Sequence, residues 1–193
     1  MIIGVDVDGC LADFNTGFIN CCVTVTGRDA FPPRPFDITV WDYPQYYGYT
    51  DEEVLKVWQT IEADEEFWTN LQPYADTHDS LTYLKHRQVK HDSRDDIYFV
   101  TARVGVEAKA QTEWWLECHG FRNPTVLISG AKSMVARALK FDSYIDDNWE
   151  NVVAVSEYSD QTRTFLLVQP WNRGNHPSMF GITEVSSINN FLD

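Results

Sequence analysis

The stretch Ile2-Ile3-Gly4-Val5-Asp6-Val7-Asp8-Gly9, close to the N-terminus, joins a short apolar run to two carboxylates and a glycine. Its length and its β-branched residues are typical of a buried strand. In open parallel sheets, ligands bind beyond the carboxyl ends of the strands. A strand that ends at Asp6 therefore presents its acids to such a site, and Gly9 permits the tight turn that would swing Asp8 over it.

Four further runs of strand length occur in the second half of the chain, at residues 97–100, 125–128, 143–145 and 164–168. Helical patterns separate them at residues 105–119, 131–140 and 149–156, and another helix is expected over 75–88. Strands that alternate with helices pair in parallel, because parallel neighbours need a crossover connection. The pattern predicts an α/β fold built on a doubly wound parallel sheet.

The segment between the first strand and residue 75 has a different composition. Helices are expected over 11–25 and 50–63, the first closed by Gly27 and the second opened by a capping box of Thr50 and Glu53. Prolines between these helices break regular structure: Pro32, Pro33, Pro35 and Pro44. The chain therefore divides into two predicted domains: a core over residues 1–15 and 76–193, and a small, mainly helical cap over residues 16–75, inserted after the first strand.

The charge balance limits the partners of the protein. Its 193 residues include 15 Lys and Arg against 29 Asp and Glu, a formal net charge of −14. A non-specific binder of long nucleic acid needs a dense basic surface, which this composition does not supply. A small anionic substrate is compatible, because a metal ion and a few cations can override the overall field locally. No apolar run approaches the length of a membrane span, and the N-terminus lacks the features of a signal peptide, so we expect a cytoplasmic protein.

The predicted strand ends bring four aspartates to one crevice. The first strand delivers Asp6 and Asp8, and the strand at 143–145 delivers Asp146 and Asp147. Alone, such a cluster would be destabilised by like-charge repulsion, which a divalent cation removes. Oxygen-only ligands favour Mg²⁺ over zinc, so these aspartates form the predicted metal site. The cysteines show no zinc-site spacing and are expected to be free, buried thiols: Cys10, Cys21, Cys22 and Cys118.

Groups suited to a phosphate are expected at the same edge of the sheet. Thr101 follows the second strand, and Lys132 begins a predicted helix, where a cation and backbone N–H groups suit an anion. Lys140 is the rival lysine, but it lies at a helix C-terminus, where cations complement the helix dipole. A carboxylate beside Mg²⁺, with a second acid poised on the leaving group, is the equipment for phosphoryl transfer through an aspartyl-phosphate.

Four short motifs occur in order along this framework: Asp6-Val7-Asp8-Gly9-Cys10-Leu11-Ala12-Asp13-Phe14, Phe99-Val100-Thr101-Ala102-Arg103, Lys132, and Tyr144-Ile145-Asp146-Asp147-Asn148. Together they resemble the motifs of the haloacid dehalogenase (HAD) superfamily of phosphohydrolases, which implies a Rossmann-like core. The DGCLADF extension, the early cap, residues 67–73 and Gln169-Pro170-Trp171-Asn172 resemble the 5'(3')-deoxyribonucleotidase branch. The departures are Trp171, where tyrosine is expected, and a polar insert at 91–96.

The resemblance implies a role for each motif. Asp6 would be the nucleophile and Asp8 the general acid and base. Mg²⁺ would be held by Asp6, the backbone carbonyl of Asp8, and Asp146, with Asp147 acting through water. The phosphate would be held by Thr101 and Lys132, with Ala102 beside them. Arg103 follows closely enough to touch substrate, and a structural ion pair is the alternative for it.

The cap is rich in aromatic side chains, because residues 31–70 hold ten of the 27 in the chain. Stacking of a nucleobase on one ring is worth about 1–3 kcal/mol. One interpretation is that Phe36, Trp41 or a nearby tyrosine stacks on such a base. The other is that these rings form the core of the cap itself.

These features predict an enzyme, a Mg²⁺-dependent phosphatase that hydrolyses nucleoside monophosphates, 5'-deoxyribonucleotides in particular. One alternative is a phosphatase acting on another phosphomonoester, either a nucleic-acid 3'-phosphate, which the net charge disfavours, or a sugar phosphate. The other is a catalytically inactive domain that binds a nucleotide or a partner, which the presence of all the acids disfavours. The expected partner is a small phosphomonoester, with neither long nucleic acid nor membrane, and a homodimer is a candidate assembly.

Overall fold

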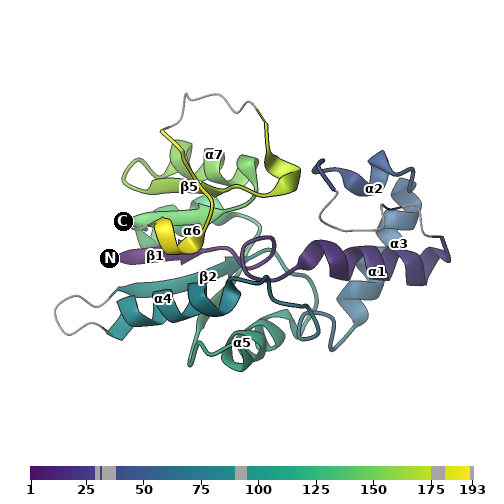
Figure 1. Ribbon diagram of the computed structural model, residues 1–193, viewed down its shortest axis with the longest axis horizontal. Helices are drawn as coiled ribbons and strands as arrows, with labels where there is room; N and C mark the ends of the chain where they lie inside the picture. Colours follow the sequence, from purple (N-terminus) through teal and green to yellow (C-terminus); the bar gives the residue numbers. More distant parts are fainter. Residues whose placement is uncertain (29–30, 32–37, 90–94, 175–180, 192–193) are drawn as a thin grey trace.

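A six-stranded sheet runs through the described part of the computed structural model, residues 1–28, 31, 38–89, 95–174 and 181–191 (Figure 1). All neighbouring strands are parallel, in the order β3-β2-β1-β4-β5-β6. The strands are β1 (Ile2–Val5), β2 (Asp96–Thr101), β3 (Thr125–Ile128), β4 (Ser143–Asp146), β5 (Arg163–Leu167) and β6 (Thr183–Val185). This confirms the predicted α/β class. Strand β6 was not expected, because only one of its three side chains is apolar.

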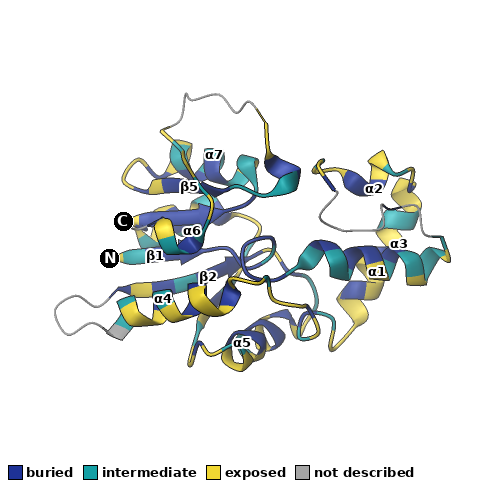
Figure 2. Ribbon diagram, in the orientation of Figure 1, coloured by how far each residue is buried: buried dark blue, intermediate teal, exposed yellow. Residues whose placement is uncertain are grey.

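Helices cover both faces of the sheet (Figure 1). One face carries α6 (Lys132–Leu139) and α7 (Trp149–Tyr158), and the other carries α4 (Thr77–Val89) and α5 (Ala108–Cys118). Successive residues of a strand therefore enter different cores. Leu166 belongs to the buried cluster that includes Val155 of α7, whereas its neighbour Phe165 belongs to the cluster that includes Leu84 of α4. Figure 2 shows the strands largely buried between these layers.

Three helices between β1 and α4 lie beyond the carboxyl end of β1 (Figure 1): α1 (Phe14–Thr26), α2 (Tyr43–Tyr46) and α3 (Asp51–Ala63). The structure confirms the capping box of Thr50 and Glu53, and Gly27 closes α1 in the left-handed conformation at φ 67°. Helix α2 corrects the expectation of no regular structure, because Pro44 lies in its first turn, where proline is tolerated. Pro32, Pro33 and Pro35 lie outside the described residues. The division into core and cap domains stays a prediction.

The two chain segments that join these helices to the sheet are hydrogen-bonded to each other. Ala12 and Pro73 form an isolated antiparallel bridge. The amide of Asp13 donates to the carbonyl of Gln72 at 2.8 Å, and the amide of Tyr74 donates to the carbonyl of Leu11 at 3.0 Å. Within the described residues, the chain thus enters and leaves this helical segment at neighbouring backbone positions.

The cysteines are free thiols, as expected, but not all are buried. Cys10 and Cys22 are buried, whereas Cys118 is exposed, because it is the last residue of α5 and faces solvent there. Among the helices of the described segments, none has both the length and the apolar character that crossing a bilayer would require.

Candidate active site

A cavity of about 380 Å³ lies where the carboxyl ends of β1, β2 and β4 meet helices α1, α2 and α3. The sheet side of its wall carries most of the predicted catalytic and metal-binding residues: Asp6, Asp8, Thr101, Lys132 and Asp147. The helical side is aromatic and apolar: Phe14, Phe18, Trp41, Tyr43, Val54 and Trp58. The structure therefore brings the separate sequence motifs to one cavity, as the strand-end argument predicts.

Lys132 bridges two carboxylates at the base of this cavity. It is the first residue of α6, and its Nζ lies 2.8 Å from Asp6 Oδ1 and 2.8 Å from Asp146 Oδ2. Burial lowers the pKa of Lys132, but the charges of Asp146 and Asp6 outweigh this and raise the pKa well above its usual value. The lysine is therefore a permanent cation. Its rival, Lys140, is exposed at the C-terminal end of α6.

Asp146 is fully buried, and protein donors occupy both of its carboxylate oxygens. Oδ2 accepts from Lys132, from the Tyr144 hydroxyl, and from Asn151 Nδ2 at 3.0 Å, while Oδ1 accepts from the amide of Asn148 at 2.8 Å. Burial, followed by the charge of Asp146, raises the pKa of Tyr144, so its hydroxyl stays neutral. With four donors around it, Asp146 acts as an anchor for Lys132.

Asp6 and Asp147 form the part of the site that can hold a metal ion. One carboxylate oxygen of Asp6, one of Asp147 and the sulfur of Cys10 all lie within 4.8 Å of one another, and the three residues are buried. Burial, followed by the charge of Asp146, raises the pKa of Asp6 well above its usual range and that of Asp147 to about 8. A cation would keep both acids ionised, and carboxylate oxygens are the donors that Mg²⁺ prefers. The residues present therefore fit this ion.

The resemblance predicts Asp146 as the direct metal ligand and Asp147 as an indirect one. This assignment stays a prediction. In the structure, protein donors contact both oxygens of Asp146, whereas Asp147 accepts from Trp171 and has an oxygen close to Asp6. Asp147 also packs against Gly9, where a Cβ would come within 2.1 Å of its Oδ2. With φ at +77°, this position accepts only glycine without strain.

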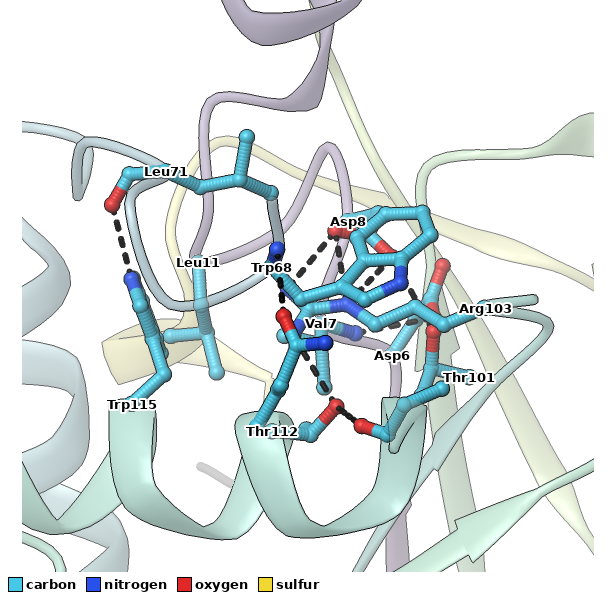
Figure 3. A network of polar contacts seen from close by, with 12 residues as sticks. Asp6, Val7, Asp8, Leu11, Trp68, Leu71, Thr101, Arg103, Thr112 and Trp115 are labelled. Atoms are coloured by element: carbon cyan, nitrogen blue, oxygen red, sulfur yellow. Dashed lines mark hydrogen bonds and ion pairs between the residues drawn. The ribbon is translucent and has the colours of Figure 1, made fainter. Parts of the chain in front are cut away.

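Asp8 lies at the same edge, but its side chain belongs to a different group of contacts (Figure 3). The Thr101 hydroxyl donates to Asp8 Oδ2 at 3.0 Å, and Arg103 donates to both oxygens from Nε and Nη2. For Arg103 the structure thus shows the ion-pair alternative: its side chain is fully buried and directed at Asp8. Ala102, between the two donors, is exposed at the cavity wall.

The cap aromatics divide between a core and the cavity wall. Phe31 stacks on Tyr49 with ring centroids 4.8 Å apart and makes edge contacts with Tyr43 and Tyr47, so these rings form a small core. Trp41 is 48% exposed and lines the cavity, which leaves it available to a ligand. The other predicted stacking residue, Phe36, lies outside the described residues.

Several side chains of the site were not predicted as functional. Trp171 Nε1 donates to Asp147 Oδ2 at 2.8 Å, Asn172 Nδ2 donates to the Asp147 carbonyl at 2.7 Å, and Gln169 Nε2 donates to the Gly9 carbonyl at 2.7 Å. This segment follows β5, whose carboxyl end lies beside that of β4. Trp58 of α3 was also missed, although it lines the cavity. The motif at residues 169–172 does not say where this segment lies. The adjacency of β4 and β5 does, because it places the residues after β5 next to Asp147.

Comparison with known proteins identifies the family of this chain. A family model described as "5' nucleotidase, deoxy (Pyrimidine), cytosolic type C protein" matches residues 1–180. A comparison with curated proteins finds no match.

Solved structures with a similar fold include hydrolases and a dehalogenase. A HAD family hydrolase from Deinococcus radiodurans R1, with bound phosphate and sodium, has a TM-score of 0.62 at 12% identity and covers 96% of this chain and 90% of that chain. An L-2-haloacid dehalogenase from Xanthobacter autotrophicus, with chloropropionic acid covalently bound, has a TM-score of 0.56 at 12% identity and covers 97% and 95%. A haloacid dehalogenase-like hydrolase from Streptococcus pneumoniae has a TM-score of 0.55 at 12% identity and covers 86% and 84%. These likenesses show the fold.

Proposed function

This chain belongs to the family of 5' nucleotidase, deoxy (pyrimidine), cytosolic type C proteins, phosphomonoester hydrolases of the HAD superfamily, and we propose that it hydrolyses nucleoside monophosphates with Mg²⁺ as cofactor. The proposed substrates are 5'-deoxyribonucleotides. The observation that carries the proposal is the two-sided cavity, with acids and a lysine on one wall and aromatic rings on the other. A nucleoside monophosphate has the same division, because its phosphate is anionic and its base offers a flat face for stacking.

In the proposed first step, a carboxylate oxygen of Asp6 attacks phosphorus in line with the ester oxygen of the sugar. The bond between phosphorus and that ester oxygen breaks, and Asp8 donates a proton to the leaving oxygen. The phosphoryl group is left on Asp6 as an aspartyl-phosphate. Lys132 lies 2.8 Å from Asp6 and would offset negative charge on the phosphoryl oxygens, with the Thr101 hydroxyl and the chain at Ala102 beside it.

In the second step, a water oxygen attacks phosphorus and Asp8 takes the proton of that water. The bond between phosphorus and Asp6 breaks, which releases inorganic phosphate and restores the carboxylate. Asp8 must therefore stand close to both the leaving oxygen and the attacking water. Its position at the cavity wall, hydrogen-bonded to Thr101, supports this role.

The carboxylates of Asp6 and Asp147 would hold the cation, and the backbone carbonyl of Asp8 is the further ligand expected from the motif. When bound, Mg²⁺ supplies positive charge to the phosphoryl oxygens and orients them for displacement. Asp146 would act through Lys132, by fixing the position of its ammonium group.

The test is release of inorganic phosphate from ribo- and deoxyribonucleoside 5'- and 3'-monophosphates, pyrimidine and purine, with Mg²⁺ and with EDTA. An aryl phosphate and a 3'-phosphorylated oligonucleotide complete the panel, and Asp6→Asn protein supplies the background. We expect turnover that depends on Mg²⁺ and is concentrated on 5'-deoxyribonucleotides. Turnover of the aryl phosphate alone would refute the nucleotide assignment, and turnover unaffected by EDTA would refute the cofactor.

Two broader expectations accompany this proposal. A cytoplasmic location rests on the cytosolic type named in the description of the family. A homodimer stays a prediction, which light scattering coupled to size-exclusion chromatography would decide.

A further inference from the structure

Arg103 is buried at the edge of the cavity, and two of its three guanidinium nitrogens donate to one carboxylate. Its side chain has 0% of its surface exposed, although its partner Asp8 is 20% exposed. Nη2 donates to Asp8 Oδ1 at 2.9 Å, and Nε donates to Oδ2 at 3.0 Å and to Oδ1 at 3.2 Å. This forked geometry fixes the plane of the carboxylate as well as its distance, which a lysine ammonium cannot do.

The guanidinium is itself held in place from two further sides (Figure 3). Its Nη1 donates to the Thr112 hydroxyl at 3.0 Å, and that hydroxyl donates to the Ala108 carbonyl within α5 at 2.6 Å. The ring of Trp68 covers the guanidinium, with its centroid 4.9 Å from Cζ, and its Nε1 donates to the Val104 carbonyl at 2.9 Å. Arg103 therefore has little freedom to follow a moving partner or to turn toward a ligand.

We propose that Arg103 is a positioning residue that holds the Asp8 carboxylate in the orientation needed for proton transfer. The proposal rests on the proposed function, because it takes from it the role of Asp8 as general acid and base. Asp8 lies in the turn after β1, and the contacts with Arg103 and Thr101 restrict its rotamers. The buried guanidinium acts on the substrate only through Asp8.

The expected effect follows from what an acid and base contributes. General acid–base catalysis by a positioned side chain is worth about 10²–10⁴-fold, and a displacement of about 1 Å can cost 10²-fold. Arg103→Gln should therefore lower kcat for a nucleotide about 10²-fold. KM should stay within about twofold, because each guanidinium nitrogen already donates to Asp8 or Thr112.

The experiment compares two leaving groups in Arg103→Gln and wild-type protein with Mg²⁺. A nitrophenyl phosphate releases its phenolate without a proton from Asp8, so phosphorylation of Asp6 should stay within about fivefold of wild type. Hydrolysis of the aspartyl-phosphate still needs Asp8, so it should slow about 10²-fold. Rapid mixing should then show a burst of about one nitrophenolate per active site. A merely structural role would lower the amplitude or rate of this burst together with steady-state turnover.

Controls make the result decisive. Arg87→Gln breaks another arginine pair with a buried carboxylate, Arg87 with Asp95 at 2.8 Å, at the amino end of the sheet, and should leave kcat unchanged. If Arg103→Gln does not fold, Thr112→Val is the second variant, because it removes only the hydroxyl that accepts from the guanidinium. It should show the same burst, with a kcat loss of about 3–10-fold, smaller than the loss expected when Asp8 is fully misplaced. Equal losses in burst and turnover, or an unchanged kcat on nucleotides, would overturn the proposal. If Asp8→Asn protein turns nucleotides over at the wild-type rate, the proposed function fails at Asp8, whatever the Arg103 variants do.

Discussion

Replacement of Lys132 by methionine removes the ammonium group that pairs with two buried carboxylates, those of Asp6 and Asp146. The ammonium lies 2.8 Å from both Asp6 and Asp146, and each of the three side chains is at most 6% exposed. Breaking a buried charge pair costs about 3–5 kcal/mol, because the remaining charge is left in a poorly solvated place. Lys132 pairs with two acids, but both can take up protons once the lysine is gone. We therefore expect a loss of stability within the range for one broken pair, not twice that range.

For a chain of this length, 1 kcal/mol moves the melting temperature by about 2–4 °C. The variant should therefore melt about 6–20 °C below wild type in EDTA at pH 7.5. The difference should be smaller at pH 5.5, because protonation of Asp6, whose pKa is raised by burial and by Asp146, relieves the unpaired charge. Thermal unfolding followed by circular dichroism measures both values, and phosphate release from a nucleotide should fall about 10²–10³-fold.

Lys140→Met is the matched control. Lys140 belongs to the end of the same helix but is exposed, so its replacement should change stability by less than about 0.5 kcal/mol and leave turnover intact. The reasoning is refuted if the two variants melt together, or if Lys140→Met loses as much activity as Lys132→Met.

Three further outcomes are expected. Asp6→Asn should reduce phosphate release with Mg²⁺ to below about 1% of wild type, since the nucleophile contributes through covalent catalysis, and retention of more than a few per cent would exclude that role. Metal-free protein should lose stability as the pH rises from about 4 to 8. The pKa values of Asp147 (about 8) and Asp6 are raised in the folded state, which therefore binds more protons than the unfolded state over this range. Melting temperatures in EDTA that do not fall between these pH values would contradict the prediction. Trp41→Ala should raise KM for nucleotides by about 5–150-fold, the loss of one stacking contact, and an unchanged KM in folded protein would remove Trp41 from the base site.

The sheet and most of its helices could be predicted from the sequence, because alternation of short apolar runs with helical patterns leaves few topologies. The capping box of Thr50 and Glu53 was predictable for a local reason, since both partners lie within four residues. Strand β6 was not, because Thr183–Val185 is short and its pairing with β5 is decided by tertiary contacts. Helix α2 was not predictable from its proline, because a proline that breaks most regular structure is tolerated in the first turn of a helix, where Pro44 lies.

Within the site, the sequence predicts which residues meet but not how they share their contacts. That Asp146 binds Lys132 while Asp147 lies beside Asp6 depends on two further donors to Asp146. Tyr144 belongs to the fourth motif, but the motif assigns it no role, and Asn151 lies outside every motif. The Trp171 contact depends on the adjacency of β4 and β5, and the Arg103 contact with Asp8 spans 95 positions of the sequence. Such pairings arise from the three-dimensional packing of separate strands, so spacing along the chain carries little information about them.

The junction at Ala12 and Pro73 has a consequence for how this protein can change. Some sixty residues leave the core and return to it at neighbouring backbone positions, so the excursion closes on itself before the chain continues into α4. Lengthening or shortening that excursion costs little closure entropy, since the cost grows only with the logarithm of its length. A change in the length of this excursion therefore adds little to the entropic cost of folding, provided that the buried residues it shares with the sheet, such as Phe18 and Val57, keep their packing. Under the proposed function, variation within the excursion would change the aromatic wall of the cavity, whereas the carboxylates that act at phosphorus follow strands of the sheet.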